Sequence, residues 1–256
     1  MSVAPDVEAA LQGLVGRTPL LLALDFDGVC APLVDDPEAA RALPGTASVV
    51  AELAALDGVE VAMVSGRSLA SLTHVSQAPA GVLLVGGHGA ETGDGVVLPD
   101  DAAALLETIT AEVEAIVAGA DGTSVEHKPT SVVLHTRRAD DEATASAQRA
   151  VLDGPGARDG VRVRPGHEVV ELSVVTADKG QALRALRDRV GASAAVYVGD
   201  DVTDEDAFAV LDQESGDVAV KVGSGETRAR LRVESPEDVT ELLERLLDLL
   251  RTGHRG

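Results

Sequence analysis

The sequence predicts an α/β fold, in which a doubly wound, Rossmann-like parallel sheet carries an inserted α+β module. Two observations support this. Short apolar runs that end in turns alternate with helical patterns over 1–103 and again over 174–256, as in βαβ units. Between them, residues 104–173 contain paired strands with few helices, which is typical of an α+β module. The chain of 256 residues, 45% of them hydrophobic, is long enough to build a core in each part.

The expected elements of the first region follow in order. A short amphipathic helix over 7–15 leads into a buried strand over 21–24. Thr46 is expected to cap a helix that runs to about Leu56. The remaining elements of this region are strands over 59–64 and 82–85 and a helix near 68–75.

The pattern changes after Pro99. The inserted module is expected to contain helices over 101–117 and 141–152 and strands over 124–127, 131–136, 161–164 and 168–173. The first pattern then returns with a helix over 178–190 and strands over 195–198 and 217–220. Ser235 as N-cap and Pro236 at the first position begin a final helix with one apolar face.

The composition excludes several classes of function. The formal net charge is −22, so neither nucleic acid nor an anionic membrane is an expected partner. The single cysteine, Cys30, excludes an intrachain disulfide and a cysteine zinc site. No apolar stretch reaches roughly 18 residues, and the first ten residues lack the basic start and apolar run of a signal peptide. A cytoplasmic protein is therefore expected.

The stretch Leu21–Val34 carries the first candidate for chemistry. Its apolar run ends in Asp25, Phe26, Asp27 and Gly28, at the edge where open α/β sheets bind ligands. Side chains alternate along a strand, so Asp25 and Asp27 are expected to point the same way. One carboxylate can attack phosphorus or bind a metal while the other moves a proton. The alternative is that both are turn and capping residues.

Three further motifs fall at or just after the ends of expected strands or loops: SGR at 65–67, DKG at 178–180 and GDDVTD at 199–204. In a parallel sheet these ends meet at one edge. Carboxylate oxygens there suit Mg²⁺, while lysine and hydroxyl donors hold phosphate oxygens. Taken singly, Ser65 can be a helix cap, Lys179 a solvated residue and the acids helix-start residues. Together, in this order, the motifs favour phosphoryl transfer.

The ordered motifs resemble those of the haloacid-dehalogenase-like phosphatase superfamily. This resemblance implies that Asp25 is the nucleophile and forms an aspartyl-phosphate. It implies that Asp27 protonates the leaving sugar oxygen and then activates water. Ser65 and Lys179 would hold the phosphate.

The same resemblance implies a magnesium site. Mg²⁺ would lie on the Asp25 carboxylate, the Asp27 backbone carbonyl and Asp200, with Asp204 as a supporting acid in the metal site. At the position of Cys30, many members of the superfamily carry Leu. We expect Cys30 to be a small, buried core residue, so that the change has little effect on the mechanism.

The inserted module displays charged residues in a pattern of its own. Glu126 and Lys128 alternate on one expected strand and so share a face, Arg137 follows the next strand, and Glu171 lies near the end of another. Acids and bases displayed together suit a neutral polyol, because both hydrogen-bond hydroxyls strongly. The alternative is a solvated face of weak ion pairs.

Four segments narrow the resemblance to the trehalose-6-phosphate phosphatase family: GHGAE at 87–91, EHKPTSVVLHTR at 126–137, GHEVVEL at 166–172 and GDDVTDEDAF at 199–208. The resemblance implies a cap domain over residues 104–173 whose positions matching Glu126, Lys128, Arg137 and Glu171 contact the sugar. Arg67 and His167 belong to the same expected substrate-binding set: Arg67, His167, Glu126, Lys128, Arg137 and Glu171.

His167 stands where the family commonly has Lys, so one sugar contact differs. His88, between two glycines, can be a metal ligand, a catalytic base or a loop-packing residue, and a loop role is expected because a lone histidine has no companion ligands.

The expected activity is Mg²⁺-dependent hydrolysis of trehalose 6-phosphate. Two alternatives stay open: a phosphatase for a related sugar phosphate, such as sucrose phosphate or mannosylphosphoglycerate, or a catalytically silent sugar-phosphate sensor or partner subunit. The expected partner is a small sugar phosphate. A monomer is the default state, with association with a trehalose-phosphate synthase as the alternative.

Overall fold

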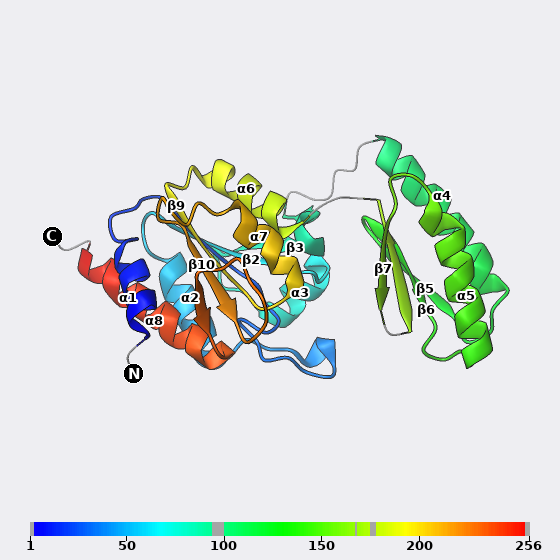
Figure 1. Ribbon diagram of the computed structural model, residues 1–256, viewed down its shortest axis with the longest axis horizontal. Helices are drawn as coiled ribbons and strands as arrows, with labels where there is room; N and C mark the ends of the chain where they lie inside the picture. Colours follow the sequence, from blue (N-terminus) through cyan, green and yellow to red (C-terminus); the bar gives the residue numbers. More distant parts are fainter. Residues whose placement is uncertain (1–2, 94–99, 167, 175–177, 254–256) are drawn as a thin grey trace. The chain divides into compact units, whose positions relative to one another are not determined.

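The protein is described by a computed structural model over residues 3–93, 100–166, 168–174 and 178–253 (Figure 1). The chain divides into two compact units. The first, the core unit, joins residues 1–93 to 177–256, and the second, the module, comprises 94–176. The second unit extends beyond the expected 104–173 at both ends, and its first helix begins at Asp100.

The core unit alternates strands and helices. Its strands are β1 (Leu20–Leu24), β2 (Val59–Val64), β3 (Leu83–Gly86), β4 (Glu91–Thr92), β9 (Ala194–Gly199), β10 (Val218–Val222) and β11 (Leu231–Val233). Its α-helices are α1 (Pro5–Gln12), α2 (Pro44–Ala54), α3 (Leu69–Ser76), α6 (Lys179–Val190), α7 (Glu205–Val210) and α8 (Pro236–Gly253). Among the residues that the structure describes, three 3₁₀ turns lie between them: η1 (Pro37–Ala39), η2 (Gly87–Gly89) and η4 (Val202–Asp204).

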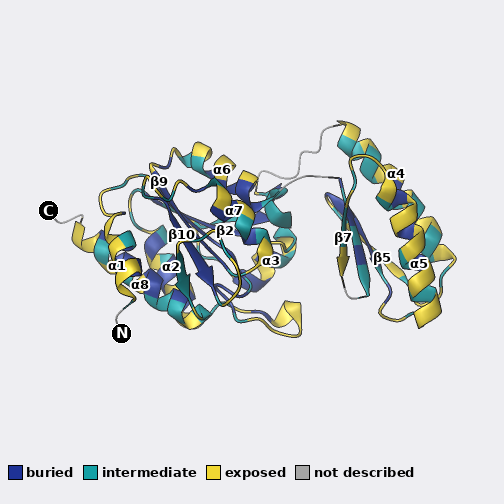
Figure 2. Ribbon diagram, in the orientation of Figure 1, coloured by how far each residue is buried: buried dark blue, intermediate teal, exposed yellow. Residues whose placement is uncertain are grey.

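In the described part of the core unit, the strands form a single sheet of seven in the order β11-β10-β9-β1-β2-β3-β4. Neighbouring strands are parallel except β3 and β4, which are antiparallel. The central strand β1 pairs Leu22 with Val61 on one side and with Val196 on the other. All of β1 is buried, which explains its continuous apolar run. The middle of the core sheet, where β9 and β10 lie, is likewise buried and dark blue in Figure 2. The predicted parallel α/β sheet is confirmed.

Helices cover both faces of this sheet, so alternate residues of β1 join different cores. Leu22 packs into a cluster with residues of α1, α2, α3 and α8. Ala23 packs into the opposite cluster with residues of α6 and α7. The long helix α8 buries one apolar face, as its sequence predicts, and each such Leu or Val contributes roughly 1.5–3 kcal/mol on burial.

The expectation that Thr46 caps a helix is wrong. Helix α2 begins at Pro44, whose fixed φ suits the first helical position, and the residue before it is Leu43. Thr46 is fully buried inside the helix. Its Oγ1 lies 2.7 Å from Oγ1 of Thr240, so the hydroxyl links α2 to α8 instead.

The second unit is a two-layer module. Its elements are α4 (Asp100–Ala118), β5 (Ser124–Lys128), β6 (Ser131–His135), α5 (Asp141–Asp153), η3 (Pro155–Ala157), β7 (Arg162–Gly166) and β8 (Val169–Ser173). In the described residues the strands form an antiparallel sheet of four in the order β5-β6-β8-β7. Val132 and Leu134 face α4 and α5 and are fully buried. The alternate residues of β6 occupy the other face, which we call the open face.

None of the helices in the described parts of the chain combines the length and apolar character that a membrane span requires.

Candidate functional site

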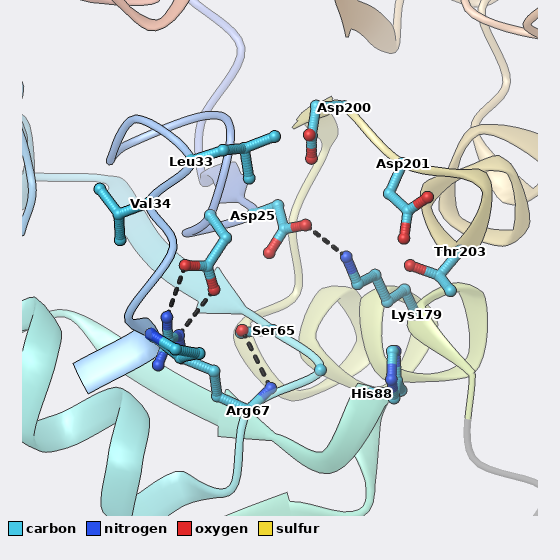
Figure 3. Close-up of a pocket in the computed structure, with 13 residues that line it drawn as sticks. Asp25, Leu33, Val34, Ser65, Arg67, His88, Lys179, Asp200, Asp201 and Thr203 are labelled. Carbon is cyan, nitrogen blue, oxygen red and sulfur yellow. Dashed lines mark hydrogen bonds and ion pairs between the residues drawn. The ribbon is translucent and has the colours of Figure 1, made fainter. Parts of the chain in front are cut away.

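A cavity of about 590 Å³ opens at the carboxyl edge of the core sheet (Figure 3). The segments that follow β1, β2 and β9, together with the start of α6, each contribute side chains to it. It is lined by Asp25, Asp27, Leu33, Val34, Pro37, Ser65, Gly66, Arg67, His88, Lys179, Asp200, Asp201 and Thr203. The parallel topology thus brings the four separate motifs together in one cavity.

Lys179 lies between two carboxylates at the base of the cavity. Its Nζ donates to Oδ2 of Asp25 over 2.6 Å and to Oδ1 of Asp204 over 2.7 Å. Lys179 is 2% exposed, so it is not a solvated residue of a first turn. Burial would lower the pKa of Lys179, but Asp25 and Asp204 outweigh it, and the pKa lies above its usual value. The lysine is therefore a fixed cation.

Asp25 lies just beyond the end of β1, and its backbone N–H continues the ladder to the carbonyl of Val198. Its Oδ1 accepts from the N–H of Phe26 over 2.6 Å, while its Oδ2 accepts from Lys179. Burial raises the pKa of Asp25 to about 7, against the opposing effect of Lys179. Both contacts orient the carboxylate.

Asp204 holds the lysine and the following loop. Its Oδ1 also accepts from the hydroxyl of Tyr197 over 2.8 Å. Its Oδ2 accepts from the backbone N–H groups of Asp200 and Asp201 over 2.9 and 2.8 Å. The two oxygens of a carboxylate have about four acceptor sites. In Asp204 the hydrogen bond from Lys179 and the three contacts just described occupy all four. Asp204 therefore fixes the position of Lys179 and of the loop at 200–201. Asp201 is the N-cap of η4, as expected if this acid serves only to begin a helix.

The SGR turn presents a hydroxyl and a guanidinium. Ser65 is buried, and its Oγ accepts from the N–H of Arg67 over 3.1 Å, which leaves the hydroxyl proton to be donated. The helix-cap alternative for Ser65 fails, because Ser68 caps α3 by accepting from Ser71 N–H.

Arg67 and Asp27 form a two-pronged ion pair. Nε of Arg67 donates to Oδ2 of Asp27 over 2.6 Å, and Nη2 donates to Oδ1 over 2.7 Å. Donation of these hydrogen bonds to the Asp27 carboxylate raises the pKa of Arg67 above its usual value. The guanidinium also lies 5.9 Å from the ring centre of Phe26. Asp27 retains 31% of its side-chain surface exposed, so it borders the open part of the cavity.

Three carboxylates form a cluster in which Asp25 and Asp200 could hold a cation and Asp204, whose acceptor sites are occupied, would support them. Asp25, Asp200 and Asp204 each offer an oxygen, and these oxygens lie within 4.8 Å of one another. Gly28 has φ +74°, and a Cβ there would lie 2.0 Å from Oδ2 of Asp200, so glycine leaves room for this carboxylate. Burial and the nearby Asp204 raise the pKa of Asp200 to about 6. Clustered, partly desolvated carboxylates fit a hard divalent cation.

The open face of the module carries most of the remaining predicted residues. The pairing register sets four residues in one row across the sheet: Glu126, Val133, Glu171 and Arg164.

Glu171 forms the centre of a small polar cluster. It accepts from Oγ of Ser131 over 2.6 Å and from Nζ of Lys128 over 3.3 Å. Burial would raise the pKa of Glu171, but Ser131, Lys128 and Arg164 outweigh it, so the pKa lies below its usual value. Glu126 lies further along the face, 2.9 Å from Nε2 of His135.

Two predicted residues lie apart from this cluster. Arg137 is exposed in the turn after β6, two residues beyond His135. His167 lies outside the described residues.

The sequence reasoning missed Ser131, His135 and Arg164 on the open face. Their signal is the alternation along each strand, which becomes readable only once the strand pairing is known.

The fold and the site define the class of protein first. The chain is similar to the C-terminal domain of trehalose-6-phosphate phosphatase from C. albicans, with a TM-score of 0.71, 22% identity, and coverage of 97% of this chain and 98% of that one. It is also similar to a haloacid dehalogenase-like hydrolase from Bacteroides thetaiotaomicron, with a TM-score of 0.60, 13% identity and coverage of 88% and 98%. These likenesses show the fold that the chain shares with both structures, a parallel α/β core with an inserted unit.

The sequence then gives the family. Residues 23–237 match the family model described as trehalose-phosphatase. The chain is 37% identical over 275 residues to a trehalose-phosphate phosphatase of Mycobacterium avium (strain 104), covering 99% of this chain and 69% of that protein. The corresponding protein of Mycobacterium marinum (strain ATCC BAA-535 / M) is 36% identical over 270 residues, covering 98% and 68%. The chain belongs to the trehalose-phosphatase family.

Proposed function

We propose that the protein hydrolyses trehalose 6-phosphate to trehalose and inorganic phosphate through an aspartyl-phosphate. The observation that carries this proposal is the buried pair of Asp25 and Lys179, 2.6 Å apart, in the cavity that Ser65 and Asp27 also line. A fixed carboxylate beside a fixed cation suits attack on phosphorus, because the cation offsets the charge of the phosphoryl oxygens. Membership of the trehalose-phosphatase family supports trehalose 6-phosphate as the substrate.

The core unit would perform the reaction in two steps. In the first, an oxygen of Asp25 bonds to phosphorus while the bond from phosphorus to the sugar oxygen breaks, and Asp27 gives that oxygen its proton. In the second, Asp27 takes a proton from water, whose oxygen displaces Asp25 from phosphorus. Ser65 and Lys179 hold the phosphoryl oxygens throughout.

Arg67 has a place in this scheme that differs from a simple substrate contact. Its ion pair holds both oxygens of Asp27, so it positions the acid and base. Asp27 must then leave one of these contacts when it carries the proton. A substrate contact by Arg67 is compatible with this, since the guanidinium lines the same cavity.

The donor set fits Mg²⁺ as the cofactor. Asp25, Asp200 and the backbone carbonyl of Asp27 would hold the ion, and Asp204 would brace them through its contacts with the Asp200 loop. When bound, Mg²⁺ supplies positive charge that screens the phosphoryl oxygens and the clustered carboxylates.

Residues 104–173 would act as the domain that recognises the sugar. Glu126, Lys128 and Glu171 share the open face of the module, and their charges suit the hydroxyls of a disaccharide. Arg137 is proposed as a further contact from the turn after β6. His167 is retained as a proposed contact on its sequence position.

The experiment that tests this proposal measures phosphate release from a panel of esters, with Mg²⁺ and with a chelator. The panel contains trehalose 6-phosphate, sucrose 6-phosphate, glucose 6-phosphate and mannosylphosphoglycerate. We expect Mg²⁺-dependent release from trehalose 6-phosphate in strong preference to the others. Preferential release from another ester would overturn the substrate, release that survives the chelator would overturn the cofactor, and silence across the panel would overturn the enzyme.

A further inference from the structure

The short turn η2 holds its central residue, His88, in an unusual backbone conformation. His88 has φ +57° and ψ +22°, and both of its neighbours, Gly87 and Gly89, also have positive φ. A residue with a Cβ adopts this left-handed region only at an energetic cost. Such strain persists where the surrounding structure imposes it, and it gathers at functional sites. The turn therefore merits a functional explanation.

The turn is fixed to the segment that carries the candidate phosphate-binding hydroxyl. The N–H of His88 donates to the carbonyl of Ser65 over 2.9 Å, and the N–H of Gly87 donates to the carbonyl of Arg67 over 2.7 Å. Glu91, which follows the turn, accepts from the N–H of Leu69 over 2.8 Å. These contacts set the position of His88 relative to Ser65.

The imidazole of His88 lies directly over the glycine of the SGR turn. A Cβ at Gly66 would lie 2.6 Å from Cε1 and 2.7 Å from Nε2 of the ring. On the other side, a Cβ at Gly89 would lie 2.9 Å from Cβ of Ala182 in α6. Glycine at position 66 permits the ring to lie this close to the SGR turn, and glycine at position 89 permits η2 to pack against α6.

The ring lines the same cavity as Asp25, Ser65 and Lys179 (Figure 3). The phosphoryl group has three outer oxygens, and each accepts more than one hydrogen bond. Lys179 already donates to two carboxylates, which leaves one N–H, and Ser65 has one O–H. The donors of Lys179 and Ser65 would not fill all the acceptor sites of the phosphoryl oxygens. An imidazole N–H at the wall of this cavity would be a further donor to them.

We propose that His88 contacts the substrate and donates a hydrogen bond from its imidazole to the phosphoryl group. This inference rests on the proposed function, since it takes the cavity to be a phosphate site. It replaces the loop role expected from the sequence. It also explains the strain, because the left-handed turn carries the ring to the cavity wall.

The test measures the binding of inorganic phosphate to the full chain by calorimetry in the presence of Mg²⁺. His88→Gly removes the ring and relieves the backbone strain, so we expect at least about tenfold weaker phosphate binding with an unchanged or higher thermal midpoint. His88→Asn keeps an N–H donor and tolerates positive φ, so it should bind phosphate more tightly than the glycine variant. Gln77→Gly is the matched control, since Gln77 also has positive φ, +45°, at the end of α3.

Four results would overturn the inference: no phosphate binding by the wild type, unchanged binding in His88→Gly, equal weakening in His88→Gly and His88→Asn, or equal weakening in Gln77→Gly. A lower thermal midpoint in His88→Gly would also count against it, because it would indicate a structural role. Phosphate binding requires no turnover. The binding test therefore remains decisive for His88 even if none of the esters in the panel is hydrolysed.

Discussion

Replacement of Lys179 by methionine should destabilise the core unit by about 3–5 kcal/mol at pH 8. The variant loses the cation that binds Asp25 and Asp204, which are 5% and 0% exposed. Methionine fills most of the same space, so the main change is the loss of charge. Removing one partner of a buried ion pair leaves its carboxylates desolvated and facing each other, and this accounts for the expected magnitude.

The destabilisation should shrink as the pH falls from 8 to 6. The pKa of Asp25 is already raised to about 7, and the loss of Lys179, which lowers it, moves it higher. A carboxyl whose pKa is higher in the folded state binds more protons there than in the unfolded chain. Protonation therefore favours folding, and the stability of the variant is lost as the pH rises through that pKa.

Lys221→Met is the matched control. Lys221 is also buried, at 5% exposure, but its Nζ donates to the backbone carbonyl of Asp200. Removing this donor leaves a neutral acceptor unpaired, which costs about 1–3 kcal/mol. The control should therefore cost less than Lys179→Met and should show a weaker dependence on pH.

The assay is urea unfolding followed by tyrosine fluorescence. Tyr197 is the single tyrosine, and the chain has no tryptophan, so the signal reports on the core unit. Tyr197 is fully buried, and its hydroxyl donates to Asp204. The reasoning is refuted if Lys179→Met unfolds at the wild-type urea midpoint at pH 8. It is equally refuted if both lysine variants lose the same stability.

Three further predictions concern the reaction. Asp25→Asn should lower turnover by about 10⁴-fold or more while the tyrosine signal of folding is kept, and near-normal phosphate release would exclude a covalent step on this residue. Glu171→Gln should raise the KM for trehalose 6-phosphate about tenfold and leave p-nitrophenyl phosphate unchanged, whereas an equal loss on both would make Glu171 a structural residue. Gly28→Ala should abolish Mg²⁺-dependent turnover, because its Cβ would meet Asp200 at 2.0 Å. Gly191→Ala, with φ +64° and no atom within 4 Å, carries the same backbone strain and should retain activity.

The sequence predicts the central strands well because they are buried on both faces and appear as unbroken apolar runs. β1 (Leu20–Leu24), for example, contains the expected 21–24, and β2 spans the expected 59–64 although Glu60 interrupts its apolar run. The edge strands β4 and β11 were not predicted, since they are two and three residues long and half-buried, so no periodic pattern marks them. Thr46 shows a different limit, because its partner Thr240 is distant in the sequence.

The same distinction applies to the site. Parallel topology predicts that the motif residues meet at one edge of the sheet, and the cavity contains them. It does not predict that the oxygens of Asp204 accept hydrogen bonds from Lys179, Tyr197 and two backbone N–H groups. Nor does it predict that His88 lines the cavity, since this depends on the fold of a three-residue turn and on the close approach of Gly66.

Burial separates the Lys179 cluster of the core unit from the charged side chains of the open face. Lys179 is 2% exposed, whereas the side chains of Lys128 and Glu171 are 26% and 25% exposed. Glu126 and His135 are 49% and 41% exposed. Breaking a pair at such exposed positions costs about 0–1 kcal/mol, against about 3–5 kcal/mol for the buried one. Under the proposed function, sugar hydroxyls would therefore exchange for the partners of Glu126 and Glu171 at little cost, while the buried groups around Lys179 keep fixed positions.

This difference has a consequence for specificity. Substitutions on the open face should change which sugar is accepted while the core unit keeps its stability and its turnover of small phosphate esters. Substitutions in the Lys179 cluster should affect stability and the chemistry of every ester together. A random library screened on sucrose 6-phosphate should therefore concentrate its gains at positions such as Lys128, Arg164 and Glu171. Gains concentrated around Asp204 or Tyr197 would contradict this division of roles between the two units.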